Sequence, residues 1–424
     1  MTVGGNPVDL LVVSPDLPAF DRNAGWQRLH TMLRIWSQHY RVAFVSLSAA
    51  GDSHSMRYAG ALQDLGIEVW SSPRADPSQV VARVRGGVIF EFFRSAEQYL
   101  RRIRIRRPDL PILVDSVDLH FLRELRAAPY ASRPDEARRR AGRTRSREVR
   151  VYDEADMVIT VTDEDRVALL REIPAASVQV VTNIHDVSAN VPSFADRRPA
   201  SILFVGGFLH PPNADAVVFF CRDILPLVRQ RLPDASLTIV GHEPASQISD
   251  LSEPGVLVAG WVPDVRPYID SHRVAIAPLR FGAGMKGKIG EALAAGLPVV
   301  TTPIGAEGMG LENGTTAIIA DSPAAFADAV VRLCTNPGLH ARLSASGQDH
   351  VRRSWALPVV ERNLLAVTDE FLRMRPKVIT PASRLALHAQ EIYRVSGLSQ
   401  HLERIKWLAV SYASRLRGKR RRIC

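Results

Sequence analysis

A glycine-rich segment at residues 278–300 holds the residue types and spacing best suited to chemistry. It runs Pro-Leu-Arg-Phe-Gly-Ala-Gly-Met-Lys-Gly-Lys-Ile-Gly-Glu-Ala-Leu-Ala-Ala-Gly-Leu-Pro-Val-Val. We expect a strand ending at Pro278, a glycine loop, and a helix from about Lys286 to Ala295. Glycines let a phosphate approach the backbone, and the free amides of a first helical turn attract negative charge. The segment therefore predicts a phosphate or diphosphate site.

Two lysines and a glutamate extend this prediction. Lys286 and Lys288 place positive charges where a diphosphate would lie, and Glu291 follows one turn further along the helix. A carboxylate there can accept hydrogen bonds from both hydroxyls of a ribose, as acidic residues do in dinucleotide-binding folds. The alternative is a glycine turn before a core helix, with solvated lysines. The combination of charges makes that alternative the less favoured one.

A second turn of the same kind lies at residues 204–213. Its sequence, Phe-Val-Gly-Gly-Phe-Leu-His-Pro-Pro-Asn, predicts a strand, a glycine loop and a helix with Asn213 as N-cap. Gly206 and Gly207 would lie beneath a phosphate. Many α/β turns have this form, so the segment gains weight only beside the lysine loop.

The elements that must position these residues follow one rhythm along the chain. Short apolar runs rich in Val and Ile alternate with longer amphipathic stretches, of which the first is a predicted helix at Ala24–Gln38. Continuous apolar runs are typical of parallel strands covered by helices on both faces. The predicted strands are Val8–Val13, Val42–Leu47, Ile67–Trp70, Val88–Phe90, Ile112–Val114, Met157–Val161, Val178–Val181, Ile202–Val205, Leu237–Val240, Val256–Ala259, Val274–Pro278, Val299–Thr301 and Ala317–Ala320.

The alternation of apolar runs and amphipathic stretches is interrupted once, around residues 187–200, by Ser, Asn, Pro and charged residues, which indicates a linker. We therefore predict an α/β fold with two doubly wound domains in tandem. The predicted boundaries are residues 1–190, a linker at 191–200, a second domain at 201–365, and a return helix with an amphipathic basic tail at 366–424.

Composition agrees with a globular protein of two domains. The 424 residues are 46% hydrophobic and 23% charged, which is ordinary for soluble proteins. Cys221, Cys334 and Cys424 are too few and too far apart for a disulfide framework, so a reducing compartment is favoured. No secretory signal is visible at residues 1–8, and no apolar run is long enough to span a membrane. We expect a cytoplasmic protein.

The formal net charge of +10 gathers in three runs, Arg101–Arg107, Arg138–Arg150 and Arg415–Arg422. Such charge favours an anionic partner. The stretch Leu385–Arg417 is amphipathic with helical period, so it predicts peripheral contact with an anionic inner membrane face. A helix packed on the protein is the alternative. No nucleic-acid-binding module is present, and nucleic acid is not an expected partner.

The order of motifs from Ile202 to Trp355 resembles the C-terminal domain of family 4 glycosyltransferases. It runs Phe-Val-Gly-Gly, Pro-Pro-Asn-Ala-Asp-Ala, Ile-Val-Gly-His, Ala-Gly-Trp-Val-Pro-Asp-Val, Ala-Pro-Leu-Arg, the lysine loop, Glu-Ala-Leu-Ala-Ala-Gly-Leu-Pro-Val-Val-Thr-Thr and Gly-Ala-Glu-Gly. The resemblance implies the GT-B fold, in which two Rossmann-like domains face each other across a cleft. It also implies a nucleotide-diphospho-sugar donor, transfer with retention of anomeric configuration, a glycan or lipid-linked acceptor, and no cofactor or obligatory metal.

The resemblance carries roles onto individual positions. It implies Lys288 as diphosphate ligand and catalytic stabiliser of the leaving group, and Glu291 as ribose ligand. Glu307 would lie near the nucleotide in the next loop. The predicted donor-binding set is completed by Gly25, Gly206, Gly207, Arg280, Gly282, Gly284, Met285 and Lys286.

Two departures from the family pattern concern the donor. Many members carry a first glutamate eight positions before Glu291, where this chain has Ala283. Many also carry an Arg and a Lys after the first glycine strand, and residues 208–213 contain neither. Lys286 and Lys288, with Arg280, would then have to neutralise more of the donor's diphosphate charge. The departures put the donor sugar in doubt and keep an inactive homologue open.

The N-terminal half resembles the family less closely. Gly25, in the turn after the first strand, is the best match to a glycine that touches the donor diphosphate across the cleft, and Arg28 lies one turn on. Asp118 and His120 follow a central strand and are candidate acceptor-side catalytic residues. For His120 a purely structural role is equally open. Residues 163–165, Asp-Glu-Asp, look like a metal-binding motif but are better explained as a helix N-terminus, and no metal site is expected.

The function predicted from these patterns is retaining sugar transfer in glycan, polysaccharide or glycolipid synthesis. One alternative is a catalytically inactive nucleotide-sugar-binding or scaffolding homologue. Another is a nucleotide-sugar epimerase or a glycan phosphorylase of the same fold. A nicotinamide dehydrogenase is disfavoured because the first strand-to-helix turn lacks Gly-x-Gly-x-x-Gly.

Overall fold

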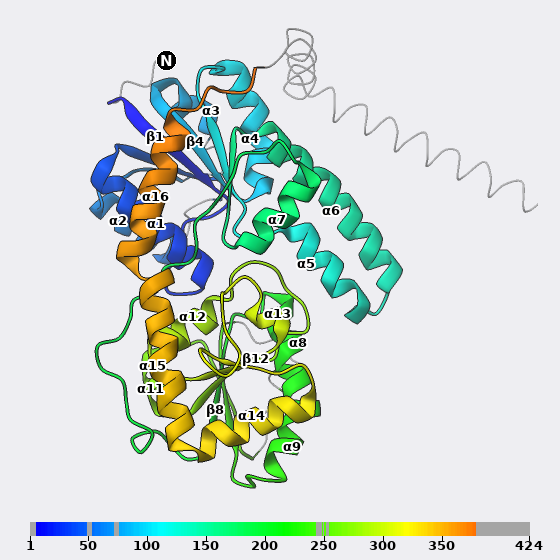
Figure 1. Ribbon diagram of the computed structural model, residues 1–424. Helices are drawn as coiled ribbons and strands as arrows, with labels where there is room; N and C mark the ends of the chain where they lie inside the picture. The colour runs from blue at the N-terminus through cyan, green and yellow to red at the C-terminus, as the bar shows by residue number, and fades with distance from the viewer. Residues whose placement is uncertain are drawn as a thin grey trace, which may run out of the picture.

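The computed structural model describes residues 6–48, 53–71, 76–242, 248, 250–251 and 254–378. Two α/β domains lie one above the other in Figure 1, each built on one twisted sheet with helices on both faces. The predicted tail, Leu385–Arg417 with its basic end, lies outside the described residues.

The N-terminal sheet has seven parallel strands in the order β3-β2-β1-β4-β5-β6-β7. Its central strands are buried on both faces, which is why they read as unbroken apolar runs. The strands are β1 Val8–Ser14, β2 Val42–Ser46, β3 Glu68–Ser71, β4 Val84–Glu91, β5 Ile112–Asp115, β6 Met157–Thr160 and β7 Val178–Val180.

The C-terminal sheet has six parallel strands in the order β10-β9-β8-β11-β12-β13. In both sheets the order reverses beside the first strand, and α/β proteins bind ligands at such switch points. The strands are β8 Ser201–Val205, β9 Ser236–Val240, β10 Val256–Gly260, β11 Val274–Ala277, β12 Val299–Thr301 and β13 Ile318–Ile319.

Helices cover both sheets, and the site depends mainly on the four that begin at the cleft: α1, α5, α8 and α12. The helices of the N-terminal half are α1 Ala24–His39, α2 Ser53–Asp64, α3 Pro77–Val80, α4 Phe93–Arg106, α5 His120–Ala127, α6 Pro134–Glu154 and α7 Asp163–Glu172. Those of the C-terminal half are α8 Pro211–Phe219, α9 Leu225–Arg229, α11 Arg266–Ser271, α12 Gly287–Ala294, α13 Pro303–Ala306, α14 Pro323–Thr335, α15 Pro337–Ser354 and α16 Leu357–Leu372.

The last helix returns to the first domain. Figure 1 shows α16 continuing from α15 and lying along the N-terminal domain beside α1. Its Phe371 packs where a side chain on Gly87 would collide, and the Trp36 indole Nε1 donates a 2.9 Å hydrogen bond to the Thr368 hydroxyl. The return helix therefore begins at Leu357, nine residues before the predicted start at residue 366, because its apolar face belongs to the N-terminal core.

Every predicted strand is present, and so is the early helix, so the expected α/β architecture is confirmed. The largest difference is β4, which begins four residues before the predicted run, across Gly86 and Gly87. Asn213 was wrongly expected to cap its helix: α8 begins at Pro211, after His210.

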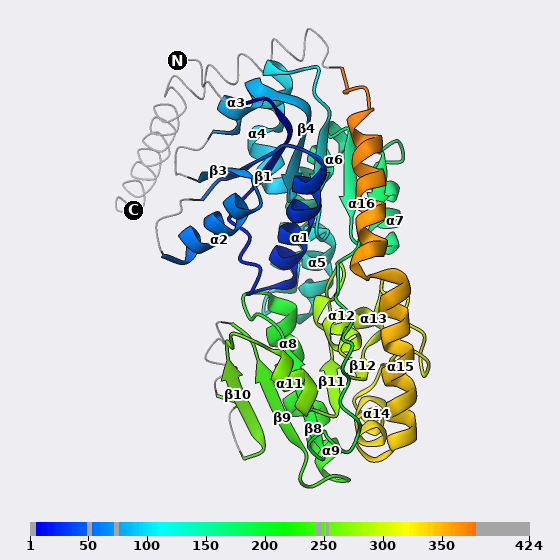
Figure 2. The same cartoon turned by 90° about the vertical axis from the view of Figure 1, so that its left-hand side faces the viewer.

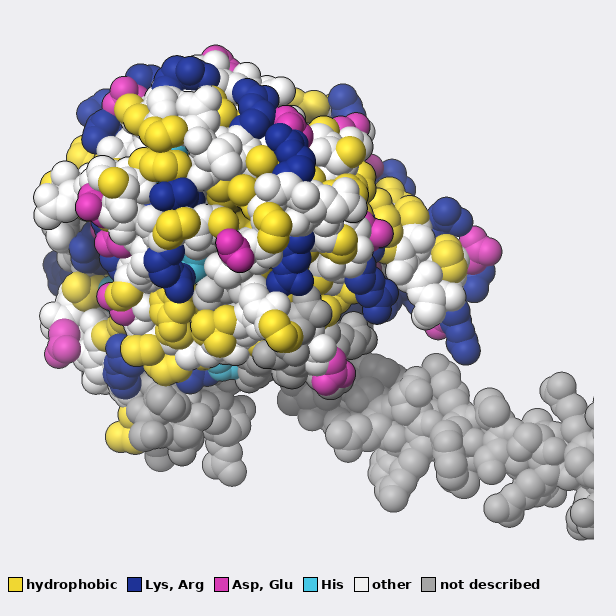
Figure 3. All heavy atoms as spheres, turned by 90° about the horizontal axis from the view of Figure 1, so that it is seen from below, with side chains coloured by type: hydrophobic (Ala, Val, Ile, Leu, Met, Phe, Trp, Pro, Cys, Tyr) yellow, Lys and Arg dark blue, Asp and Glu magenta, His cyan; other side chains and the backbone are white. Residues whose placement is uncertain are grey.

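No helix among the described residues is long and apolar enough to cross a membrane. Seen from below, in Figure 3, basic and acidic side chains are scattered among apolar and neutral ones. That end of the molecule shows no continuous field of one sign.

Candidate functional site between the domains

Two helices from different domains meet head to head at the cleft. The first residue of α12, Gly287, lies so close to Ala24, the first residue of α1, that a Cβ on Gly287 would come within 2.3 Å of the Ala24 Cβ. Both helix N-termini point their free amides and positive dipole ends at the same region. Gly25 follows Ala24, so the structure brings this predicted donor residue beside the lysine loop. In Figure 2 the cleft-side end of α1, in the upper domain, lies above α12 and α8 of the lower one.

The glycine loop reaches this position through backbone that favours glycine. Gly282 and Gly284 have φ angles of 159° and 69°. A Cβ on Gly284 would lie 2.9 Å from the Asp118 Cβ and 3.0 Å from the Val117 carbonyl oxygen. The loop therefore packs directly on the N-terminal domain, and Met285 extends this contact because its Sδ accepts a 3.3 Å hydrogen bond from the Asn183 amide.

Lys288 is the more isolated of the two predicted lysines. Its ammonium donates to the Asn213 side-chain oxygen and lies 4.9 Å from the centre of the Phe204 ring. Burial, followed by repulsion from Lys286, lowers the pKa of Lys288 to about 7. No carboxylate among the described residues pairs with it, so an external anion would find an uncompensated cation.

Lys286 is only 8% exposed and donates a 3.2 Å hydrogen bond to the Glu307 carbonyl oxygen. Burial lowers the pKa of Lys286 to about 8, although Glu307 and then Asp165 attract its charge. The two lysines therefore differ: Lys286 is anchored to the protein, and Lys288 is held mainly by an amide.

Glu291 lies one turn into α12, as the sequence predicts. Desolvation, and then repulsion from Asp264, raises the pKa of Glu291 to about 7. Within the described part of the chain no hydrogen bond or ion pair reaches its carboxylate. A half-buried acid in this condition retains its capacity to accept hydrogen bonds from a ligand.

The first glycine turn serves the lysine rather than an open phosphate cradle. A Cβ on Gly206 would lie 2.8 Å from the Asn213 amide nitrogen and 3.2 Å from the Lys288 Cε. Gly207 faces open space, and its carbonyl oxygen accepts a 2.7 Å hydrogen bond from Asn213. Asn213 therefore fixes both the turn and Lys288, a role that sequence analysis missed.

Across the cleft, the loop between β5 and α5 holds the predicted acceptor-side residues. Val117 has a φ of 58°, a strained conformation for a β-branched residue. Asp118 pairs with Arg123, and its Oδ1 lies 3.2 Å from His120 Nδ1 without the alignment of a hydrogen bond. Two buried polar atoms, Asp118 Oδ1 and His120 Nδ1, thus have unused hydrogen-bonding capacity beside the loop.

His120 also has a structural role. It begins α5, where the buried Glu148 carboxylate accepts the backbone amides of His120 and Phe121 at 3.1 and 2.9 Å. Its ring meets Phe92 and Phe93 edge-on, with centroids 5.7 and 5.2 Å away. The structural role expected as one alternative is present, and the catalytic role stays a prediction.

His210, at the start of α8, feels the charges of cations from both domains. Desolvation, then Arg123 and Lys288, lowers the pKa of His210 to about 3. His120 and Lys286 contribute in the same direction. Cations of the acceptor-side helix α5 and of the lysine loop thus act on the same position, although Arg123 is itself paired with Asp118.

Three other candidate cations or acids are already paired. Arg28 is buried, in a 2.5 Å ion pair with Asp115, so it supports the fold rather than a phosphate. Arg280 is engaged through two nitrogens by Asp215 and is not a free cation in this structure. Glu307 forms a two-oxygen ion pair with Arg126, at 2.5 and 2.8 Å.

The acidic run at residues 163–165 forms the first turn of α7, with Thr162 as N-cap, as predicted. Asp165 is 3% exposed, and burial raises its pKa, although its Thr162 contact and the Lys286 charge oppose this. No group of metal-ligating side chains occurs in the described ranges. This acid instead lies behind the glycine loop, near Gly284 and Lys286.

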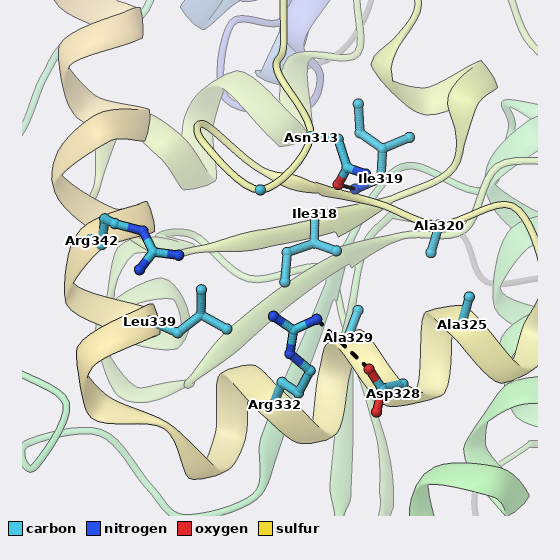
Figure 4. Close-up of a pocket in the computed structure, with 11 residues that line it drawn as sticks. Asn313, Ile318, Ile319, Ala320, Ala325, Asp328, Ala329, Arg332, Leu339 and Arg342 are labelled. Atoms are coloured by element: carbon cyan, nitrogen blue, oxygen red, sulfur yellow. Dashed lines mark hydrogen bonds and ion pairs between the residues drawn. The ribbon is translucent and has the colours of Figure 1, made fainter.

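A separate hollow lies on the C-terminal domain and contains none of the predicted site residues. Figure 4 shows its apolar side chains, Ile318 and Leu339 among them, with Arg332, Asp328 and Arg342 also lining it. It lies between α14, α15 and the edge strand β13. It therefore gives no support to the predicted chemistry, which concentrates at the cleft.

The rarity of lysine in this chain is a sequence signal for the two lysines of the site. The chain contains 54 basic residues, and only five of them are lysine, with none before Lys286. Arginine stays charged in proteins, whereas a lysine shifts its pKa readily when buried. Two lysines only two positions apart in such a chain are therefore informative. The roles of Asn213, Arg123 and Arg126 had no comparable signal.

Fold and site together define the class: two Rossmann-like domains facing each other across a cleft, which is the GT-B fold. Residues 199–336 match the family model for Glycosyl transferases group 1, so the C-terminal half of the chain is similar to that family. The expected family resemblance and fold are thereby confirmed.

Solved structures agree on the fold. Sucrose-phosphate synthase from Thermosynechococcus elongatus superposes with a TM-score of 0.66 at 14% identity, covering 85% of this chain and 98% of that one. HepE from Anabaena, in complex with UDP-glucose, gives a TM-score of 0.64 at 14% identity, covering 86% and 100%.

Curated relatives match over a shorter stretch. A phosphatidyl-myo-inositol mannosyltransferase of Mycobacterium tuberculosis is 33% identical over 175 residues, which is 38% of this chain and 45% of that protein. A 44.6 kDa protein from the cps region of Klebsiella pneumoniae is 27% identical over 150 residues, or 33% and 39%. The match thus spans less than half the length of these relatives.

Proposed function

We propose that this protein transfers a sugar from a nucleotide-diphospho-sugar to an acceptor hydroxyl, with retention of anomeric configuration and without a metal or cofactor. The observation that carries the proposal is the meeting of the α1 and α12 N-termini beside Lys288, a desolvated cation that no carboxylate of the described residues pairs with. A diphosphate supplies the negative charge that such an arrangement attracts.

The neighbouring groups suit the rest of a nucleotide-sugar. Glu291 lies one turn into α12, and there its carboxylate would accept hydrogen bonds from both ribose hydroxyls of a donor bound at the helix start. Asp118 and His120 lie on the opposite wall, beside Gly284, where an acceptor hydroxyl would approach the sugar. The family of the C-terminal domain and the UDP-glucose bound to HepE support this kind of donor.

The reaction follows from this placement. The bond between the anomeric carbon and the diphosphate breaks, and its electron pair goes to the phosphate oxygen. The acceptor oxygen bonds to the anomeric carbon on the same face, and its proton passes to the departing diphosphate. Lys288 and the helix N-termini stabilise the growing negative charge, which is usually the largest catalytic contribution.

The first test is binding. Thermal shift and calorimetry with UDP-, GDP-, ADP- and dTDP-sugars should reveal one nucleotide that stabilises the protein. Glu291→Ala should lose this stabilisation, whereas the exposed Glu312→Ala, in the same domain, should keep it. If no nucleotide binds the wild-type chain, the proposal is wrong.

One second function has an observation in its favour. Ala283 replaces a glutamate that many relatives carry, and Arg280 is already paired, which would suit a nucleotide-sugar-binding homologue without activity. Nucleotide binding with no consumption of any donor, across glycan and lipid-linked acceptors, would support this candidate instead.

The acceptor and location are part of the same proposal. A glycan or lipid-linked acceptor is consistent with the name of the mycobacterial relative, which acts on phosphatidyl-myo-inositol. We propose peripheral contact with an anionic membrane through residues 385–422, on the cytoplasmic side. Co-sedimentation of the full chain with vesicles containing anionic lipid, compared with neutral vesicles, tests it.

A further inference from the structure

Helix α5 of the acceptor-side domain reaches across the cleft to the donor loop. Its Arg126 guanidinium donates a 2.8 Å hydrogen bond to the Gly282 carbonyl oxygen. The same guanidinium donates hydrogen bonds to both carboxylate oxygens of Glu307, at 2.5 and 2.8 Å. One side chain of the N-terminal domain thus holds the first glycine of the lysine loop and the neighbouring loop together.

The contact continues to the lysine. Lys286 donates to the Glu307 carbonyl oxygen at 3.2 Å, so Arg126 and Lys286 hold the same residue from its two ends. The Arg126 and Glu307 side chains are only 26% and 30% exposed. A planar, bidentate pair of this kind is geometrically specific, and partial burial weakens its screening by water.

Further contacts place Arg126 within a larger interdomain seam. Tyr130, just beyond α5, stacks on Phe281 of the loop with ring centroids 5.5 Å apart. Arg280 lies over the Tyr130 ring, 4.5 Å from its centre. The glycine loop is therefore held from the N-terminal domain at several points, and Arg126 makes a charged part of that contact.

We propose that Arg126 is a positioning residue, which makes closure of the two domains a condition for a correctly shaped donor-phosphate loop. Arg126 acts through Gly282 and Glu307 rather than by touching the donor. Glu307, predicted as a donor ligand, then acts as the partner of Arg126. This inference rests on the proposed function for its binding readout, but the closure itself has an independent readout.

The structural reason for such coupling lies in the loop itself. Gly282 and Gly284 carry no side chain, and glycine backbone has more conformations to lose on ordering than that of other residues. A clamp that orders the loop beforehand removes that cost from ligand binding. When the domains separate, the clamp is lost and the two lysines are no longer held beside α1.

The experiment compares Arg126→Ala, Arg126→Lys and the control Arg133→Ala, whose guanidinium is exposed and loosely paired with Glu136. Small-angle X-ray scattering of the full chain measures domain closure, and calorimetry measures the affinity for the donor nucleotide. We expect Arg126→Ala to increase the radius of gyration and to weaken nucleotide binding about 10- to 100-fold, since charged hydrogen bonds typically contribute that much. Arg126→Lys should fall between the two, because a point charge replaces only part of the fork.

A double-mutant cycle tests the route through Glu307. Arg126→Ala and Glu307→Ala should be strongly non-additive, since each removes the same ion pair. The proposal is overturned if Arg126→Ala lowers only the melting temperature while closure and affinity match the control, or if the two losses add.

The outcomes remain separable from those of the proposed function. If wild-type protein binds no nucleotide, the function fails, and the scattering of Arg126→Ala still decides whether Arg126 closes the domains. If wild type binds and both Arg126 variants bind equally with unchanged scattering, the function stands and the positioning role is wrong.

Discussion

The two walls of the cleft differ in how their charges are satisfied. On the C-terminal wall, Lys288 and Glu291 are desolvated groups with no oppositely charged partner among the described residues, and their pKa values are displaced toward neutrality. On the N-terminal wall, Asp118 is paired with Arg123, and Asp115 with Arg28. The first arrangement leaves buried ionisable groups without a compensating charge, whereas the charges of the second largely satisfy one another.

This difference in charge pairing distinguishes a wall suited to binding a ligand from a wall that maintains its shape. Unpaired buried charges cost stability, so their presence indicates that ligand binding compensates for them. Charges that satisfy one another hold a shape, and the strained Val117 and the clamp residue Arg126 belong to that shape. We infer that the donor side binds and that the acceptor side mainly positions.

The largest expected effect is that of removing the Lys288 side chain. Lys288→Ala should lower turnover about 10²- to 10³-fold if this cation stabilises the leaving diphosphate. Lys377→Ala, the only lysine of the described chain outside the loop, serves as control. Donor consumption by the full chain is the measurement, and a near-normal rate for Lys288→Ala would remove Lys288 from the mechanism.

The second prediction concerns pH. A bound diphosphate should raise the pKa of Lys288 from about 7 and that of Lys286 from about 8, so binding takes up protons and affinity falls as pH rises above 7–8. Ribose hydroxyls should lower the pKa of Glu291 from about 7, so binding releases a proton and affinity falls as pH drops below 7. Each group changes affinity by at most about tenfold per pH unit.

Calorimetry in two buffers of different ionisation enthalpy tests this directly. With a nucleotide-sugar, whose diphosphate does not itself titrate here, proton uptake is expected at pH 8 and release at pH 6. Lys288→Ala should reduce the uptake without affecting the release. Affinity that is flat from pH 6 to pH 9 would contradict a role for these groups.

A third prediction addresses the contact between the walls. Gly284→Ala should place its methyl against Asp118 and the Val117 carbonyl, in addition to straining a φ of 69°. Gly314→Ala has nearly the same φ, 77°, but faces open space, so it measures the backbone strain alone. We expect about 1–3 kcal/mol more loss of unfolding free energy at Gly284, a typical cost of overpacking. Equal losses in urea unfolding would show that the walls do not touch there.

The last prediction concerns folding stability and the buried cluster beneath the acceptor wall. Burial, then the Asp115 charge, raises the pKa of Glu91 to about 8, while the Ser14 hydroxyl, donating at 2.8 Å, opposes this. The folded state therefore keeps a proton that the unfolded state loses near pH 4.5. Unfolding free energy should fall as pH rises from 4.5 to 8, by at most about 1.4 kcal/mol per unit.

Glu91→Gln should flatten this slope, because the amide cannot ionise. Glu97→Gln is the matched control with opposite sign. Hydrogen bonding from Arg147 lowers the pKa of Glu97, so its stabilising contribution is present above the unfolded pKa and is lost as pH falls. If urea unfolding gives the same pH slope for Glu91→Gln and wild type, Glu91 is ionised in the folded protein.

Much of the fold was predictable from the sequence because the strands are buried on both faces. Runs such as Val299–Thr301 and Ile112–Asp115 are buried at every position and apolar except at their last residue, and that pattern does not depend on a distant partner. The glycine loop was predictable for a similar reason: Gly284 and the two lysines lie within five residues, so their chemistry is local.

The sequence by itself thus determined the two sheets, the linker region and the cluster of Lys286, Lys288 and Glu291 at one helix start. Only the tertiary structure decided which charges are free. Arg280 and Glu307 are engaged by Asp215 and Arg126, partners 65 and 181 residues away, and Asn213 faces Lys288 rather than capping its helix. Local patterns encode helix ends and apolar faces, whereas ion pairs depend on distances that exist only after the chain has folded.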